Sequence, residues 1–178
     1  MLNSQNLRLF RLNDIKGFYM ANNIYLTLTG NQQGEISAEC GTVDSIGNKY
    51  QIGHRDQIFV LQFDHSISRN QNINHQPITF CKPIDKSSPL LGNAISNNEK
   101  LELLFDFYRT AQTGTQEKYY SVKLLGAVIR KIAVSYPHAL THAENQPEEM
   151  ISIAYQSIDW QHHIAGTGGY SLWEEKVY

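Results

Sequence analysis

The sequence predicts a mainly β fold: a compact antiparallel β-barrel of two packed sheets with one flanking α-helix. Three observations support this prediction. Apolar and polar residues alternate with a period of two along most of the chain after residue 19, as they do in strands with one buried face. Charged residues make up only 18% of the chain, and the polar remainder is rich in Asn, Gln, Ser and Thr, which suit sheets and turns better than helix surfaces. One central segment has clear helical periodicity.

In the first half of the chain, alternation predicts a strand that opens at Met20 and turns over residues 30–34. The pairs Gly30-Asn31 and Gln33-Gly34 indicate that hairpin turn. The next strands are expected over residues 35–40, 57–68 and 77–82. Phe59, Leu61 and Phe63 would share one face of the strand over residues 57–68.

The helix is expected over residues 86–97. Asp85 or Ser87 can cap its N-terminus, and Pro89 lies in its first turn, where proline is tolerated. Four apolar residues form its buried face, namely Leu90, Leu91, Ala94 and Ile95.

After the helix, strands are expected over residues 100–108, 120–124, 128–136, 150–157, 158–164 and 170–173. A turn at residues 113–115 and a polar loop over residues 137–148 separate some of them, and the total is eight or nine strands. No repeat interrupts the pattern, so residues 20–178 are expected to form one barrel domain. Residues 1–19 are basic and do not alternate, which indicates an N-terminal extension whose role the sequence does not define.

A long loop over residues 41–55 departs from this regularity. It is rich in Gly, Asp, Ser and Asn, yet it carries Ile46, Tyr50 and Ile52. Loops of this length without secondary structure are usually functional or disordered. Because three large apolar side chains do not suit a disordered segment, we expect this loop to bury them against a partner.

Charge and hydropathy exclude several classes of protein. The net charge is −2, which argues against nonspecific binding to nucleic acid or to anionic lipid. No apolar run is long enough to span a bilayer, and residues 1–19 lack the apolar core of a signal peptide. The sequence therefore predicts synthesis in the cytoplasm and, for a protein that leaves the cell, a route that needs no signal peptide.

No catalytic or cofactor motif emerges, so the sequence predicts a protein that is not an enzyme and has no cofactor. His138 and His142 lack the glutamate and the helix of a zinc protease motif, and His162 and His163 are adjacent on a predicted strand. The two cysteines, Cys40 and Cys81, are expected to be buried side chains, although a bridge between them is open. Two alternatives stay open: a small-ligand-binding β-barrel, and a metal-dependent hydrolase that uses dispersed histidines.

Beyond these patterns, the residues resemble the Hcp (haemolysin-coregulated protein) family, the tube proteins of type VI secretion systems. The matching stretches are MANNIYLTLTG (20–30), DSIGNKY (44–50), NHQPITF (74–80), KPIDKSSPLL (82–91), FDFYR (105–109), QPEE (146–149), IAGT (164–167) and GYSLWE (169–174). They run in order through nearly the whole chain after residue 19.

The resemblance implies a structural subunit of the secretion tube. It implies homohexameric rings that stack into a tube, expulsion of that tube by a contractile sheath, a spike protein (VgrG) at its tip and small effectors in its lumen. It also implies that the loop over residues 41–55 contacts the next ring, with Ile46, Asn48, Tyr50 and Ile52 as the stacking residues. Head-to-tail contacts between unlike surfaces extend without limit, which suits a filament.

Overall fold

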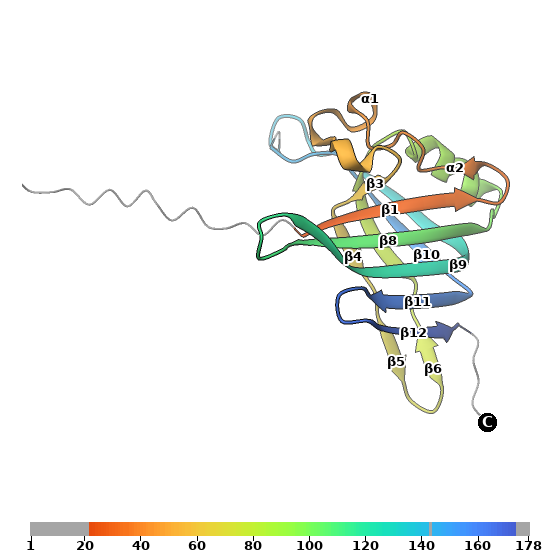
Figure 1. Ribbon diagram of the computed structural model, residues 1–178. Coiled ribbons are helices and arrows are strands. Elements are labelled where there is room, and N and C mark those ends of the chain that lie inside the picture. The colour runs from red at the N-terminus through yellow and green to blue at the C-terminus, as the bar shows by residue number, and fades with distance from the viewer. Residues whose placement is uncertain (1–21, 143, 174–178) are drawn as a thin grey trace, which may run out of the picture.

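The computed structural model describes residues 22–142 and 144–173 (Figure 1). The strands are β1 (Asn23–Gly30), β2 (Gly34–Glu35), β3 (Ile58–Val60), β4 (Gln62–Asp64), β5 (Ile67–Arg69), β6 (Ile73–His75), β7 (Ile78–Pro83), β8 (Leu101–Thr110), β9 (Gln116–Ser135), β10 (Glu148–Ala154), β11 (Ser157–His162) and β12 (Thr167–Leu172). The helices are α1 (Val43–Ile46) and α2 (Ser88–Ser96), with 3-10 turns η1 (Gly47–Lys49) and η2 (Ile52–His54). The expected extension over residues 1–19 lies outside the described residues, and the domain boundary at residue 20 stays a prediction.

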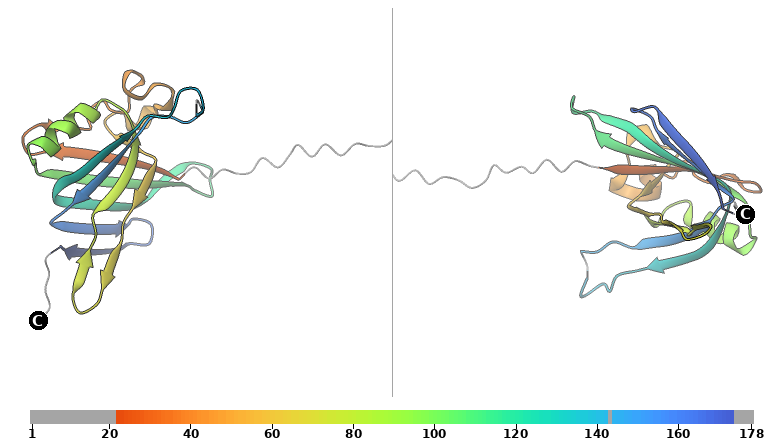
Figure 2. Two further views of the ribbon diagram at one scale, coloured as in Figure 1. Left: turned by 180° about the vertical axis from the view of Figure 1, so that it is seen from behind. Right: turned by 90° about the horizontal axis from the view of Figure 1, so that it is seen from below.

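Two antiparallel layers make up the body of the molecule. The front sheet contains β2, β1, β8, the first part of β9, β11 and β12, and β3 pairs with β1 at its other side. The back sheet contains the second part of β9, then β10, β7 and β4. Seen from below, the two layers converge on one side of the molecule and splay apart on the other (Figure 2). The prediction of a mainly β, antiparallel fold with one flanking helix is confirmed.

Strand β9 belongs to both sheets. It pairs with β8 and β11 as far as Ala127 and Leu125, and with β10 from Val128 onward. Gly126 lies at this transition with φ +59°, and a Cβ there would overlap the side chain of Gln156. The two strands expected over residues 120–124 and 128–136 are therefore one bent strand, because the glycine turns the chain from one layer to the other without ending the ladder.

The expected closed barrel is not formed among the described residues. The segment over residues 57–68 was expected to be one strand, which is wrong: β3 pairs with β1, β4 pairs with β7, and β5 pairs with β6. Leu61 separates β3 from β4, its N–H donates to the Cys81 carbonyl at 2.8 Å, and its side chain is 40% exposed. The chain therefore passes from the ladder with β1 to the ladder with β7 at this residue.

The strand expected over residues 35–40 is also wrong beyond Glu35. The N–H groups of Ile36 and Ser37 both donate to the Leu28 carbonyl, and the Ser37 hydroxyl accepts from the Leu28 N–H at 3.2 Å. The serine side chain thus takes the place of the next ladder partner. The chain then coils through Glu39, whose φ of +60° is left-handed.

The core fills the space between the two layers. Phe105 of the front sheet contacts Phe80 of the back sheet edge-on, with ring centroids 5.3 Å apart. The ring centroid of Phe63 lies 4.9 Å from that of Phe105. Phe105 and Phe80 are fully buried. Edge-on aromatic pairs add to the free energy gained from burying their area, so this triplet holds the layers together.

Helix α2 covers one end of the core, as the sequence predicts, with Leu91 and Ala94 buried. The N-terminal cap of α2 does not make the hydrogen bond that the sequence predicts. Ser87 occupies the capping position, but its hydroxyl donates to Asp85 and makes no bond to the helix. Within residues 22–142 and 144–173, no helix is both long and apolar enough to cross a membrane.

Candidate functional site

The loop over residues 41–55 is tied at its base and projects from one end of the molecule (Figure 1). The Gly41 N–H donates to the Arg55 carbonyl at 2.9 Å, which brings the two ends of the loop together. Between them lie the short turns α1, η1 and η2. A Cβ at position 41 would overlap the carbonyl oxygen of His54, so glycine alone allows this close approach.

Replacing Gly41 with alanine is expected to open the base of the loop and to lower the free energy of unfolding by about 1–3 kcal/mol, because the added methyl group meets backbone and not a flexible side chain. Urea unfolding at a fixed protein concentration measures the change. Gly53→Ala is the matched control, since a Cβ at position 53 has no atom within 4 Å. Equal losses of stability in the two variants would show that the close approach of Gly41 to His54 does not require glycine.

Charged side chains fasten the loop to the start of α2. Glu39 forms ion pairs with Lys86 at 2.8 Å and with Arg55 at 2.9 Å, and the Lys86 N–H donates to the Ser45 hydroxyl at 3.0 Å. Hydrogen bonds from Lys86 and Arg55 lower the pKa of the Glu39 carboxyl, and the Glu39 partner raises the pKa of Lys86. Exposed ion pairs contribute little to stability, so these contacts mainly orient the loop.

An aromatic floor supports the loop from below. The Tyr25 ring stacks on His54 with centroids 3.5 Å apart and planes 3° from parallel, and Tyr108 meets His54 edge-on at 5.0 Å. The Tyr25 hydroxyl donates to the Gln51 side chain. Burial raises the pKa of Tyr25 to about 12, so this hydroxyl remains a donor at neutral pH. The loop is thus a packed element on a strand of the front sheet.

The four predicted stacking residues differ in exposure. Ile52 is 91% exposed, Tyr50 is 46% exposed, Asn48 is exposed, and Ile46 is half-buried. Val43 in α1 is a further apolar residue of this loop and is 54% exposed. The sequence analysis did not single it out, although an apolar residue among turn-forming residues was a signal that could have identified it. The structure therefore presents exposed apolar side chains on an anchored loop.

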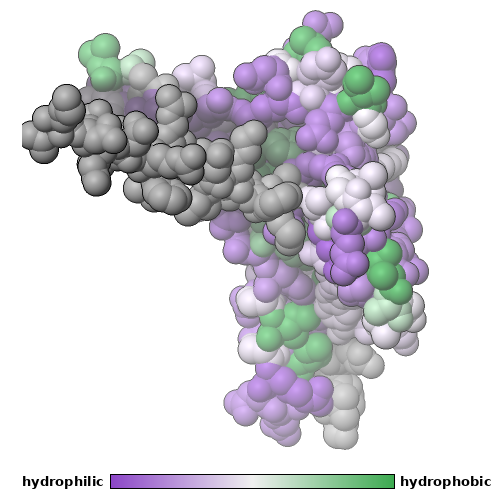
Figure 3. Space-filling model, turned by 60° about the vertical axis from the view of Figure 1, so that its left-hand side comes forward, coloured by the Kyte–Doolittle hydropathy of each residue, from purple (hydrophilic) through white to green (hydrophobic). Residues whose placement is uncertain are grey.

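A second loop lies beside the first at the same end of the molecule (Figure 2). Residues 136–147 expose Leu140 at 89% and Tyr136 at 78%. A cavity of about 690 Å³ between the two loops is lined by Lys49 on one side and by His138 and His142 on the other. On one face of the molecule, apolar side chains stand as separate patches in a mostly hydrophilic surface (Figure 3). This end combines two loops that both expose apolar side chains.

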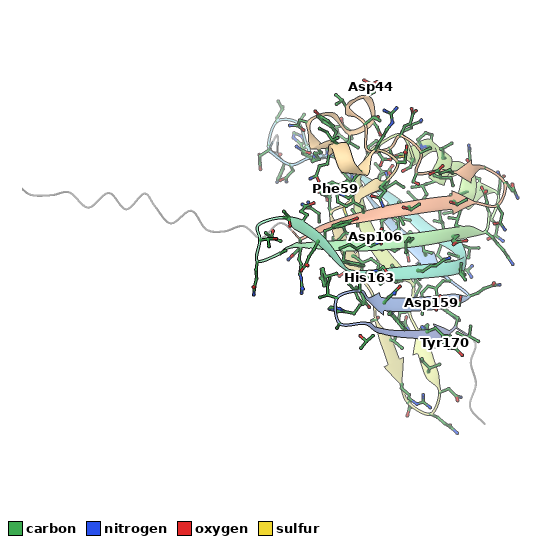
Figure 4. All side chains as sticks on the ribbon, in the orientation of Figure 1. Asp44, Phe59, Asp106, Asp159, His163 and Tyr170 are labelled. Carbon is green, nitrogen blue, oxygen red and sulfur yellow. The ribbon has the colours of Figure 1, made fainter. Side chains whose placement is uncertain are left out.

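The outer face of the front sheet is polar. Asp106, Asp159, His163 and Tyr170 lie on this side (Figure 4). His163 Nε2 lies 3.0 Å from the Ser121 hydroxyl, but no carboxylate within the described part of the chain hydrogen-bonds to this histidine. Asp106 is 5% exposed, with Lys118 Nζ 3.4 Å from its Oδ1 and no hydrogen bond to that oxygen. The arrangement lacks the oriented base that a serine nucleophile needs.

The histidines do not converge on a metal centre. Among residues 22–142 and 144–173, no group of three or more His, Cys, Asp or Glu side chains could hold an ion. His65 and His75 are brought together, but around a tyrosine hydroxyl. Cys40 and Cys81 are both buried free thiols, and burial raises their pKa values to about 12 and about 11.

Comparison with known proteins gives consistent matches. A family model described as "Type VI secretion system effector, Hcp" matches residues 25–162. "Major exported protein" of Pseudomonas aeruginosa is 36% identical over 177 residues, which cover 89% of this chain and 99% of that protein. "Uncharacterized protein YhhZ" of Escherichia coli is 48% identical over 151 residues, which cover 83% of this chain. The match spans only 37% of YhhZ.

Solved structures agree with the sequence matches. A structure described as "Crystal structure of Hcp protein" has a TM-score of 0.82 at 30% identity, covering 88% of this chain and all of that one. The secreted protein Hcp3 from Pseudomonas aeruginosa has a TM-score of 0.79 at 37% identity, covering 87% of this chain and all of Hcp3. The family model, the relatives and the fold converge, and the chain belongs to the Hcp family of type VI secretion system proteins.

Proposed function

We propose that the protein is a structural subunit of a type VI secretion tube, which forms hexameric rings that stack through the loop over residues 41–55. The observation that carries this proposal is an exposed apolar side chain on an anchored loop. Ile52 is 91% exposed, while the base of the same loop is held by backbone and side-chain contacts. A large exposed apolar side chain on an ordered support gains free energy when a neighbour covers it.

Secretion belongs to the same proposal. The Pseudomonas aeruginosa relative, of which the match covers 99%, is named a major exported protein. This name supports export of this chain through the type VI system. The partners are then a contractile sheath, a spike protein (VgrG) and small effectors carried in the ring lumen. The Hcp family is not a known enzyme family, and the geometry described above offers no catalytic set, so we propose a role in assembly and carriage and not in catalysis.

Replacing Ile52 with aspartate is expected to abolish ring stacking while leaving the fold and the ring intact. The side chain is almost wholly exposed in the single chain, so the fold tolerates a charge, but an unpaired carboxylate buried between rings is costly. Negative-stain electron microscopy counts stacked and single rings. Ile52→Leu is the matched control and should still stack, because it keeps the apolar contact.

Ile46 is a poorer site for this test, because it is half-buried and a charge there would also disturb the loop itself. If Ile52→Asp stacks as the unchanged protein does, the stacking role of this loop is wrong. Size-exclusion chromatography with light scattering tests the ring, since a hexamer has six times the 20.3 kDa of one chain. A strictly monomeric protein at micromolar concentration would contradict the proposed function.

A further inference from the structure

The β5–β6 hairpin is attached to the body through its two ends. It forms a separate two-stranded sheet, with no ladder to the ten-stranded sheet, and it projects past β12 (Figure 1). An isolated two-stranded hairpin is marginally stable in water. Its position therefore depends on the side chains at its ends, and these are His65, just before β5, and His75, the last residue of β6.

A continuous chain of hydrogen bonds links these two histidines to the rest of the fold. His65 Nε2 lies 2.8 Å from the Tyr155 hydroxyl, and His75 Nδ1 lies 2.9 Å from the same oxygen. His75 Nε2 lies 2.9 Å from the Ser171 hydroxyl of β12. His75, Tyr155 and Ser171 are each at least nine-tenths buried, so the groups depend on one another for hydrogen-bond partners. The chain joins the hairpin to Tyr155, which follows β10, and to β12 at the edge of the front sheet.

Both tryptophans of the sequence pack against this chain. Trp173 stacks on His75 with centroids 5.8 Å apart, and it meets Tyr155 edge-on at 4.9 Å. Trp160 stacks on His65 at 6.2 Å. His75 is buried beneath these rings and His65 is partly buried, so a proton added to His75 must be accommodated within the row of hydrogen bonds.

The number of added protons that His65, Tyr155, His75 and Ser171 can hold follows from counting their donors and acceptors. With both imidazoles neutral, Tyr155 donates to His65 and accepts from His75. The Ser171 hydroxyl then donates to the unprotonated nitrogen of His75. With one added proton on His75, both of its nitrogens donate, and Tyr155 still donates to His65. With two added protons, both histidines donate to the Tyr155 oxygen, whose own proton then has no acceptor, and two cations face one oxygen.

Within residues 22–142 and 144–173, no carboxylate hydrogen-bonds to either imidazole. Burial lowers the pKa of His65 and of His75, and His75 lowers the pKa of His65 further, while the Leu172 backbone acts on His75 in the opposite direction. The charged residues on neighbouring elements do not hydrogen-bond to either ring: these are Asp64 on β4, Arg69 on β5, Lys100 before β8, Arg130 on β9, Glu148 and Glu149 on β10, and Asp159 on β11. Lys100 and Arg130 line the cavity that Tyr155 also borders.

We propose that the chain His65–Tyr155–His75–Ser171 is an acid-sensitive latch, which holds the β5–β6 hairpin with no more than one added proton and releases it when both imidazoles are protonated. The direction follows from linkage. The folded state holds both rings neutral more strongly than the unfolded state does, so the latch is closed above the ordinary histidine pKa of about 6.5 and opens as the pH falls below it. The latch is a property of the single chain and does not depend on ring assembly.

Hydrogen exchange of the full-length protein between about pH 7 and pH 5 tests the latch, with rates expressed as protection factors to remove the intrinsic pH dependence. We expect protection of the amides of Ser68 and Asn74, which pair across the hairpin, to fall by roughly tenfold or more over this range, with a smaller change in β8. In His65→Gln the hairpin should keep its protection at low pH, because only one imidazole remains. His142→Gln, which alters an exposed loop histidine, should behave as the unchanged protein does.

A second measurement uses only the unchanged protein, so it does not depend on whether a variant folds. Histidine ring resonances of the unchanged protein should show His65 and His75 titrating in two coupled steps below the ordinary range, with the later step coinciding with loss of hairpin protection. The proposal is overturned if hairpin protection stays constant in the unchanged protein. It is also overturned if His65→Gln loses protection as the unchanged protein does, or if the two rings titrate independently near a pH of about 6.5.

Discussion

Replacing Lys82 with methionine is expected to lower the free energy of unfolding by about 3–5 kcal/mol. The Lys82 side chain is fully buried and its Nζ donates to Asp85 at 2.8 Å and to Glu149 at 2.9 Å. It also donates to the Pro83 carbonyl at 2.8 Å. Methionine fills a similar volume but leaves two buried carboxylates without their cation, so the loss is a desolvation penalty and not a cavity. Urea unfolding at one fixed protein concentration measures it.

The structure supplies a control that separates charge from packing. Asp85→Asn and Glu149→Gln, added to Lys82→Met, keep the acceptor oxygens but remove both charges. We expect this triple variant to recover a large part of the loss, since replacing a whole buried ionic cluster is far less damaging than removing one partner. A triple variant no more stable than Lys82→Met alone would show that packing around the aliphatic part of Lys82, and not its charge, is what the fold needs.

Replacing Phe105 with alanine is expected to lower the free energy of unfolding by about 3–5 kcal/mol. Phe105 is fully buried, and its ring lies between Phe80 and Phe63 of the back sheet. Truncation removes the apolar contact between the two layers and leaves a cavity that rigid strands on both sides cannot close. Denaturant unfolding followed by far-ultraviolet circular dichroism measures the change.

Two further variants calibrate this expectation. Phe105→Leu keeps most of the volume and should lose less than the alanine variant. Tyr170→Ala removes an aromatic ring that is 73% exposed on the outer face of the front sheet, and it should change stability by less than about 0.5 kcal/mol. Comparable losses for Phe105→Ala and Tyr170→Ala would mean that the layers are not held together by the core described here.

Much of the fold is predictable from the sequence, because alternation reports directly on burial. Strands β1, β7 and β8 and helix α2 form close to where the pattern places them. In β8, Leu101, Leu103 and Phe105 are buried as their spacing predicts. The long loop is predictable too, since turn-forming residues mark it.

The prediction fails where local pattern and tertiary pairing diverge. Residues 57–68 alternate as one strand, yet Leu61 turns outward and the chain pairs with β1 before it and with β7 after it. Residues 35–40 alternate too, but the Ser37 hydroxyl takes the Leu28 N–H and ends the ladder. A period of two says which face of a segment is apolar and nothing about which strand pairs with it.

The sequence by itself determined the fold class, the helix, the position of the loop and, through its motifs, the family. The tertiary structure alone decided that β9 serves both sheets, that Gly41 closes the base of the loop against His54, and that His65 and His75 meet at one tyrosine hydroxyl. The reason is physical. Hydrophobic periodicity arises from neighbours along the chain, whereas these contacts join residues far apart in sequence, and their geometry exists only once both sheets have packed.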